Sequence, residues 1–132
     1  MLHGLVVTHG GLGRELIRVV ELILGPVTGL DHVSNQGRSA LELTSAIQDW
    51  LTALPADAGA FLLVDDIGGS CANAAKLACG ESSETMILSG VNLALLLGFV
   101  TWRDSYSATE LSQKLVEKGR HAIARIGPAA NR

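Results

Sequence analysis

Short apolar runs and amphipathic segments alternate along the whole chain. Apolar runs of strand length recur at residues 5–7, 29–33, 60–64 and 85–88. The segments with helical spacing of apolar positions are residues 14–24, 39–54, 71–78, 92–100 and 108–126. Solid apolar strands that alternate with helices are typical of a parallel sheet covered on both faces. The pattern therefore predicts an α/β fold.

Chain length and composition agree with that fold. The 132 residues are enough for one ordinary domain, and no repeat or linker divides them, so we expect a single domain over residues 1–132. Hydrophobic residues make up 48% and charged residues 17%, as a sheet buried on both faces requires. Residues 129–132 follow the Gly127-Pro128 stop signal and are expected to form a frayed tail.

Charge and hydropathy exclude several classes of partner. A formal net charge of -3 leaves no basic stripe to neutralise phosphates, which argues against a nucleic-acid binder. The longest apolar stretches, such as residues 91–100, are shorter than the roughly 20 residues that span a bilayer. No basic segment precedes an apolar one at the start of the sequence, so we expect a cytoplasmic location.

The two cysteines do not predict a disulfide or a metal site. Cys71 and Cys79 stand eight residues apart in a predicted helix, which separates them by about 12 Å. No paired cysteine or cysteine and histidine spacing accompanies them. We expect small buried thiols, no metal and no cofactor.

Residues capable of chemistry gather where the predicted strands end. Thr8-His9-Gly10 follows the first strand, Asp65-Asp66 and Gly68-Gly69-Ser70 follow the third, and residues 89–92 follow the fourth. In open parallel sheets a ligand binds outside the carboxyl ends of the strands, where the strand order reverses. If these strands are neighbours, their ends converge on one crevice.

His9 and Asp65 have the residue types of a nucleophile and its orienting group. A carboxylate that accepts a hydrogen bond from Nδ1–H of a neutral imidazole leaves Nε2 free as nucleophile or base. The same carboxylate stabilises the cationic form of the ring. Asp65, at the end of a neighbouring strand, is the expected partner of His9.

Glycines beside this pair predict an anion site. The glycines after His9 and the Gly68-Gly69-Ser70 turn each begin a predicted helix, where exposed backbone amides favour negative charge. The hydroxyls of Thr8 and Ser70 add possible donors. The assembled hypothesis is a phosphoryl group carried on His9, oriented by Asp65 and held by Thr8, Gly10, Gly68, Gly69 and Ser70.

Other interpretations of the same residues stay open. A histidine at a strand end is often a turn residue with a satisfied hydrogen bond, and a purely structural or small-molecule-binding module fits that case. Ser70, His9 and Asp65 are also the types of a hydrolase triad, although no G-x-S-x-G elbow is present. His9, Asp65 and Asp66 would make only a loose metal site. His3, His32 and His121 are expected to be structural or exposed.

Three stretches resemble a known family in order and spacing. They are GLVVTHGGLGRELIRVVELILG, FLLVDDIGGSCANAA and ILSGVNLALLL. Together they are similar to the signature stretches of the mannose-type enzyme IIA domains of the bacterial phosphoenolpyruvate-dependent sugar phosphotransferase system. The multidomain subunit that feeds dihydroxyacetone kinase shares the fold and the histidine chemistry, but the GVN stretch favours the sugar-type domain.

The resemblance implies a doubly wound fold with a four-stranded parallel sheet of order 2-1-3-4, usually in a homodimer. It implies a phosphotransferase without a cofactor, phosphorylated on His9, with Asp65 orienting the ring and Ser70 beside the phosphoryl group. The donor would be phospho-HPr and the acceptor an enzyme IIB, with the membrane reached only through IIC and IID components.

Departures from the family pattern flank the site. Ile67 stands where an aromatic residue is common, and Cys71 and Ala94 stand where proline is common. They leave His9 phosphorylation intact but put the identity of the receiving IIB in doubt.

Leu12, Arg14 and Ile67 are candidates for partner docking. The alternative is that Leu12 belongs to the core and Arg14 is a solvated charge. A regulatory role without a transporter is the alternative to carbohydrate uptake.

Overall fold

The computed structural model describes residues 1–81 and 84–128, so the predicted tail at residues 129–132 lies outside the described residues. The described residues form four strands and five helices that alternate up to α4. In chain order they are β1 (Leu2–Thr8), α1 (Leu12–Leu24), β2 (Leu30–Ser34), α2 (Ala40–Ala53), β3 (Gly59–Val64), α3 (Ser70–Cys79), β4 (Met86–Ser89), α4 (Leu93–Trp102) and α5 (Ala108–His121).

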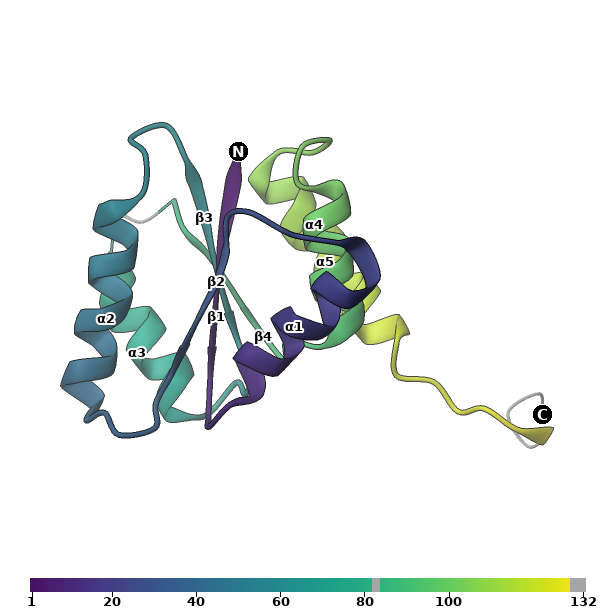
Figure 1. Cartoon of the computed structure of the whole chain (residues 1–132), viewed down its shortest axis with the longest axis horizontal. Coiled ribbons are helices and arrows are strands. Elements are labelled where there is room, and N and C mark those ends of the chain that lie inside the picture. The colour runs from purple at the N-terminus through teal and green to yellow at the C-terminus, as the bar shows by residue number, and fades with distance from the viewer. Residues whose placement is uncertain (82–83, 129–132) are drawn as a thin grey trace.

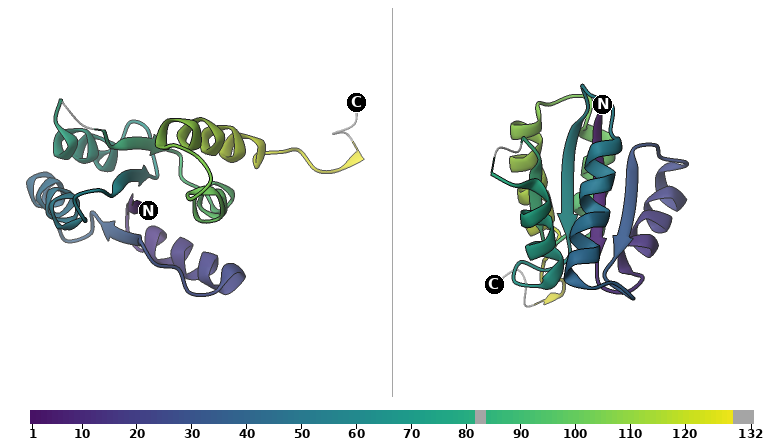
Figure 2. Two further views of the ribbon diagram at one scale, coloured as in Figure 1. Left: turned by 90° about the horizontal axis from the view of Figure 1, so that it is seen from above. Right: turned by 90° about the vertical axis from the view of Figure 1, so that its left-hand side faces the viewer.

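All four strands are parallel and belong to one sheet with the order β2-β1-β3-β4. The predicted fold class and strand order are therefore confirmed. Helices α2 and α3 cover one face of the sheet, and α1, α4 and α5 cover the other (Figure 1). The two perpendicular views show the sheet as the middle layer between them (Figure 2).

The central strands explain why their sequences are apolar throughout. Successive side chains of a strand point to opposite faces, so a strand covered on both sides needs apolar residues at every position. In β1, Val6 packs with the core under α1, α4 and α5, whereas Leu5 and Val7 pack with the core under α2 and α3. Each of these three side chains is buried.

The two cores differ in the size of their side chains. On the α4 side, the rings of Phe61 and Phe99 meet edge to face with centroids 5.4 Å apart, a favourable aromatic geometry. On the α3 side, Cys71, Ala72 and Ala75 are buried against the sheet. Small residues let α3 approach the sheet closely, which brings its first turn near the ends of the strands.

The last helix is shorter than predicted. The expected helix of residues 108–126 ends at His121, and the next two amides turn back to the carbonyls of Lys118 and Arg120. Ile123 is 82% exposed and Ile126 is 95% exposed. Because short helices depend on packing for stability, apolar residues that contact no core do not extend the helix. The predicted range of residues 108–126 included both isoleucines, which the fold does not bury.

The amino ends of the strands are tied together by a buried cation. Arg103, which follows α4, donates from its guanidinium to the carbonyl oxygens of Leu2 and Thr28 at 3.4 and 2.7 Å. Its guanidinium carbon also lies 5.7 Å from the centroid of the Phe99 ring. The start of β1, the segment before β2 and the end of α4 therefore share one anchor, at the end of the sheet opposite to His9.

Among the described residues, no helix combines the length and the apolar character needed to cross a bilayer.

Candidate active site

The strand order places His9 and Asp65 side by side. β1 lies between β2 and β3, and Val7 of β1 is in register with Val64 of β3. His9 and Asp65 directly follow these two strands, so both stand where the chain leaves the sheet in opposite directions. This is the topological switch point at which ligands bind in open α/β sheets.

Asp65 holds His9 by two hydrogen bonds to one carboxylate oxygen. The backbone N–H of His9 donates to Oδ2 of Asp65 at 2.9 Å, and Nδ1 of the ring also lies 2.9 Å from Oδ2. The His9 side chain is 50% exposed, whereas that of Asp65 is 11% exposed. The carboxylate fixes Nδ1–H as the donor tautomer, which leaves the lone pair on Nε2.

The same contacts keep Asp65 ionised. Burial alone raises the pKa of this carboxyl, but the hydrogen bonds from the backbone and the ring of His9, together with the ring's positive charge when present, hold the pKa below its usual range. Asp65 is therefore a carboxylate at neutral pH. Its other oxygen, Oδ1, is buried and accepts no hydrogen bond within the described part of the chain.

The loop after His9 is held by side chains as well as by its glycines. Oγ1 of Thr8 accepts a hydrogen bond from the amide of Gly13 at 2.8 Å, and Thr8 is buried. The amide of Gly10 donates to Oδ1 of Asn35 at 3.3 Å, and the amide of Asn35 donates to the carbonyl of Thr8. The oxygen of the Thr8 hydroxyl thus supports the loop, and the contact of this hydroxyl with an anion stays a prediction. Sequence inspection did not single out Asn35.

The Gly68-Gly69-Ser70 turn lies against the imidazole. A Cβ added at Gly69 would be 3.4 Å from Cε1 of His9, so the backbone of Gly69 packs close to the ring. Cε1 is the carbon between the two ring nitrogens, which places this turn beside both of them. Helix α3 begins at the exposed Ser70, and its first amides have no partner within the helix.

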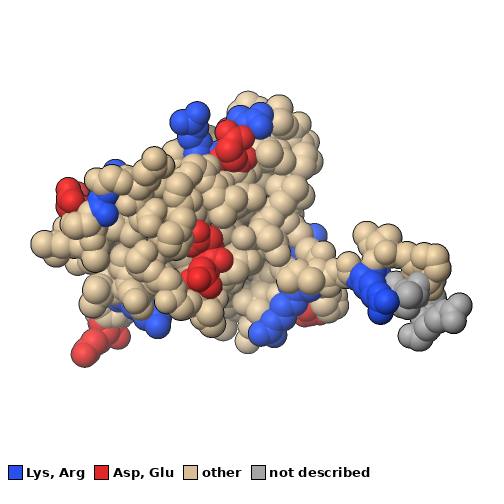
Figure 3. Space-filling view, turned by 90° about the horizontal axis from the view of Figure 1, so that it is seen from below, with Lys and Arg blue, Asp and Glu red and all other residues tan. Residues whose placement is uncertain are grey.

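Among the described residues, no cluster of basic side chains lies at the centre of the end of the molecule where the strands have their carboxyl ends (Figure 3). In Figure 3, acidic side chains lie near the middle of this face, and lysines and arginines are scattered around it. An anion held next to His9 would therefore depend mainly on backbone amides and on the dipoles of helix N-termini.

Cys71 belongs to the site, although its sequence position predicted only a small buried thiol. Its Sγ lies 3.8 Å from Nδ1 of His9, and the residue is fully buried. Burial, with the charge of Asp65 as a second cause, raises the pKa of the Cys71 thiol to about 11. Among the described residues, His9, Asp65 and Cys71 form a cluster of possible metal ligands, with ligand atoms within 4.8 Å of one another. The sequence had suggested Asp66 in the place of Cys71.

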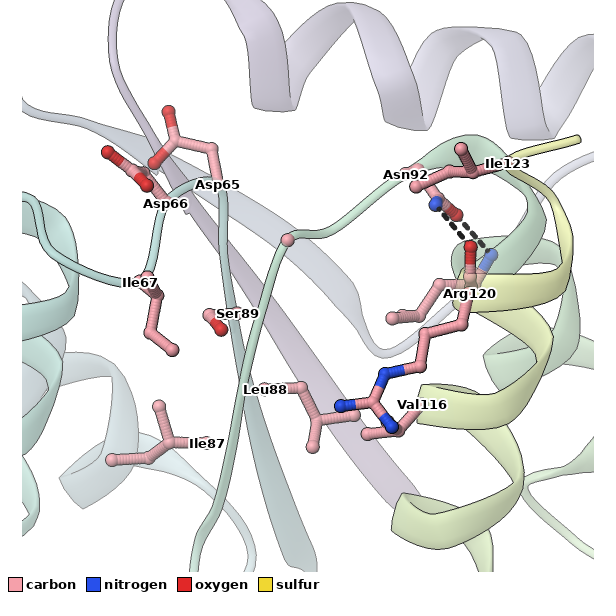
Figure 4. Close-up of a pocket in the computed structure, with 13 residues that line it drawn as sticks. Asp65, Asp66, Ile67, Ile87, Leu88, Ser89, Asn92, Val116, Arg120 and Ile123 are labelled. Atoms are coloured by element: carbon pink, nitrogen blue, oxygen red, sulfur yellow. Dashed lines mark hydrogen bonds between the residues drawn. The ribbon is translucent and has the colours of Figure 1, made fainter.

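A cavity of about 520 Å³ adjoins Asp65 and extends between β4 and α5. The close-up in Figure 4 shows Asp65 and Asp66 at one end, and the guanidinium of Arg120 near Leu88 and Val116 at the other. Asn92 is already occupied, because it caps α4 through the amide of Leu95 and donates to the carbonyl of Gly119. The asparagine of the GVN stretch thus joins α4 to α5.

The predicted docking residues are exposed, with Leu12 and Arg14 in the first turn of α1 and Ile67 in the loop before α3. Leu12 is 46% exposed and Ile67 is 77% exposed, and Arg14 is exposed as well. The alternative that Leu12 belongs to the core is therefore wrong. Of the other histidines, His3 lies near the start of β1, His32 lies within the edge strand β2, and His121 ends α5.

Fold and site together define a class of protein, a doubly wound domain with a histidine bonded to a carboxylate at its switch point, and comparison with known proteins gives the family. Residues 4–116 match the family described as "PTS system fructose IIA component" (EIIA-man). The chain belongs to this family, which supports a phosphotransfer role in the sugar phosphotransferase system.

Individual relatives agree with the family assignment. The PTS system mannose-specific EIIAB component of Escherichia coli (strain K12) is 32% identical over 120 residues, which are 88% of this chain and 36% of that protein. The chain thus aligns with only about a third of the length of this relative.

Solved structures show the same fold. Phosphotransferase system component EIIA from Streptococcus agalactiae superposes with a TM-score of 0.86 at 22% identity, over 95% of this chain and 97% of that one. The mannose/sorbose specific IIA subunit from Enterococcus faecalis gives a TM-score of 0.75 at 24% identity, over 95% and 94% of the two chains.

Proposed function

We propose that the chain is a phosphocarrier of the sugar phosphotransferase system, which accepts a phosphoryl group from phospho-HPr on Nε2 of His9 and passes it to an enzyme IIB. The observation that carries the proposal is the hydrogen bond from Nδ1 of His9 to Asp65, at a ring that is half exposed. It directs the nucleophilic lone pair toward solvent, where a protein donor can approach.

The transfer requires little from the protein beyond position and charge. The lone pair of Nε2 attacks phosphorus, a P–N bond forms, and the bond between phosphorus and the donor breaks with its electron pair leaving on the donor. The imidazole becomes positively charged in this step, and the carboxylate of Asp65 stabilises that charge at 2.9 Å. In-line approach of the two partners supplies the rest of the rate enhancement.

The phosphoryl oxygens would lie against the amides of Gly68, Gly69 and Ser70 at the start of α3, with the Ser70 hydroxyl as a further donor. Leu12, Arg14 and Ile67 would form the surrounding surface on which HPr and the IIB dock in turn. We further propose that the carrier works as a homodimer and supports carbohydrate uptake through membrane-bound IIC and IID partners.

A hydrolase is the weaker alternative. A serine nucleophile needs a hydrogen bond to its histidine base, but in the described part of the chain His9 bonds to Asp65 and has no hydrogen bond to Ser70. The His9 side chain is half exposed and Asp65 leaves its Nε2 free, which suits attack on a group carried by an incoming protein.

Intact-mass spectrometry at neutral pH tests the carrier role. The chain is incubated with phosphoenolpyruvate, enzyme I and HPr, beside the variants His9→Ala and His121→Ala. We expect one acid-labile phosphoryl group on the native chain and on His121→Ala, and none on His9→Ala. Loss of the adduct on addition of a IIB domain would support the second transfer. No adduct on the native chain, with HPr phosphorylated in the same tube, would refute the proposal.

A further inference from the structure

The inner edge of the His9 ring faces two further ligating groups. We propose that His9, Asp65 and Cys71 form a binding site for zinc(II), and that bound zinc prevents His9 from accepting a phosphoryl group. The second half of this inference rests on the proposed carrier function, whereas the first half does not.

The three ligand atoms already lie close to the spacing that zinc requires. Tetrahedral zinc with bonds of ordinary length separates nitrogen, oxygen and sulfur ligands by about 3.3–3.6 Å. Nδ1 of His9 lies 2.9 Å from Oδ2 of Asp65 and 3.8 Å from Sγ of Cys71. All three ligand atoms lie within 4.8 Å of one another. Side-chain movements of up to about 1 Å therefore convert the hydrogen-bonded cluster into a metal site.

The three ligand types favour zinc, a metal of intermediate softness, over the hard cations magnesium and calcium. One imidazole, one carboxylate and one thiolate are all common zinc ligands, and a thiolate disfavours magnesium and calcium. Asp65 has a ligating oxygen to spare, because its buried Oδ1 accepts no hydrogen bond from the described residues. The fourth position is left for water on the exposed side of His9. Because Cys71 is fully buried and the His9 side chain is half exposed, entry of the metal would require the His9 side chain to move.

Zinc on Nδ1 would reverse the tautomer on which the carrier depends. A neutral imidazole that ligates through Nδ1 carries its proton on Nε2, and Cys71 gives up its thiol proton to solvent as it binds. Nε2 then has no lone pair for phosphorus, and Asp65 ligates the metal instead of accepting from Nδ1–H. Binding of zinc at Nδ1 and phosphorylation at Nε2 therefore exclude each other through the tautomer of the ring, although the two groups would occupy different places.

Metal titration tests the site without any phosphoryl transfer. We expect one zinc per chain by calorimetry, and affinity lower by at least about tenfold in Cys71→Ala. Cys79→Ala, at the other end of α3, is the matched control and should bind as the native chain does. Binding by Cys71→Ala with native affinity, or no binding by the native chain, would overturn the site.

Cobalt(II) gives a readout that does not require Cys71→Ala to fold. Cys79→Ala contains Cys71 as its only cysteine, so a thiolate-to-cobalt charge-transfer band in that variant must come from Cys71. The band is expected, and its absence would contradict thiolate ligation.

Phosphorylation with and without zinc then tests the regulatory half. The native chain and Cys79→Ala should accept less phosphoryl group from purified phospho-HPr when zinc is present, and a chelator should restore it. The phosphorylation of Cys71→Ala, whatever its rate without zinc, should not respond to zinc. Zinc that binds but leaves the native rate unchanged would overturn the regulation alone. No phosphorylation of the metal-free chain would instead refute the carrier function and leave the metal site standing.

Discussion

At the scale of single residues, the site depends on which nitrogen of the His9 ring is already bonded within the fold. Asp65 receives both the backbone amide and Nδ1 of His9 on one oxygen, so a single carboxylate fixes the position of the residue and the tautomer of its ring. Cys71 lies against the same nitrogen. The inner edge of the ring is therefore a contact surface of the fold, and the outer edge is left for chemistry.

Replacement of Asp65 by asparagine should slow phosphorylation of His9 by about 10²-fold or more. An amide can turn its NH₂ group toward the ring and stabilise the wrong tautomer, and it has no charge to offset that of the imidazolium. Rapid-quench measurement with phospho-HPr gives the rate. Asp66→Asn, the neighbouring exposed carboxylate without a hydrogen bond to His9 among the described residues, is the control. Equal rates for both variants would contradict the role given to Asp65.

The sequence predicted the pairing of His9 with Asp65 but not the side-chain directions around it. Both residues directly follow apolar strands, and periodicity locates strand ends well. It does not tell which bonds a hydroxyl at the last strand position makes, so the bond that Thr8 accepts from the amide of Gly13 was not predicted. The contact of Cys71 with His9 depends on how closely α3 packs, which a single sequence does not encode in any local pattern.

At the scale of elements, the helices differ in how their first backbone amides are capped. α2 and α5 begin with complete capping boxes, through Ser39 with Glu42 and Ser107 with Glu110. α1 and α3 begin after glycines whose lack of a side chain leaves their first amides without a side-chain cap from that position. α1 and α3 are the helices that directly follow His9 and the Gly68-Gly69 turn, whereas α4, at the same edge of the sheet, is capped by Asn92.

Ser39→Ala should lower the free energy of unfolding by about 1 kcal/mol, because the amide of Glu42 loses its acceptor at the start of α2. Urea unfolding at neutral pH measures the change. Ser112→Ala, a serine within α5 whose hydroxyl bonds to the carbonyl of Thr109, is the matched control. Its effect should be near zero or slightly stabilising, since alanine favours helix interiors. A cost as large as that of Ser39→Ala would mean that the capping box is not the cause.

Element boundaries show how far local patterns reach. All four strands and five helices were predicted in their observed order, since apolar runs, Gly-Pro stops and amphipathic spacing are local signals. The end of α5 was not, because Ile123 and Ile126 have the spacing of a buried helix face while the fold places no core beside them. Burial is a property of the assembled layers and cannot be read from a segment alone.

At the scale of the whole molecule, stability and chemistry lie at opposite ends of the sheet. The buried guanidinium of Arg103 holds the amino ends of the strands through Leu2 and Thr28. The carboxyl ends contain His9, Asp65 and the starts of α1 and α3. No motif in the sequence marked Arg103, because a lone arginine after an apolar helix is usually a solvated charge.

Arg103→Met should lower the free energy of unfolding by about 2 kcal/mol or more while leaving His9 chemistry unchanged. The substitution keeps most of the apolar stem but leaves two carbonyl oxygens without their charged donor. Urea unfolding measures the first effect. The rate of phosphorylation at low temperature, where the variant is still folded, measures the second. A fall in that rate with no fall in stability would show that the two ends are coupled.

The bond between His9 and Asp65 joins positions 56 residues apart, and it forms only after β3 has paired with β1. A nascent or partly unfolded chain contains the same histidine, but without the carboxylate beside it the ring has no preferred tautomer and no stabilised cation. Under the proposed function, the rate of phosphoryl acceptance would therefore depend on folding as well as on the chemistry of His9. Under the proposed carrier function, copies that have not completed their sheet would accept phosphoryl groups far more slowly, so in a culture under heat stress the phosphorylated fraction would represent mainly folded molecules.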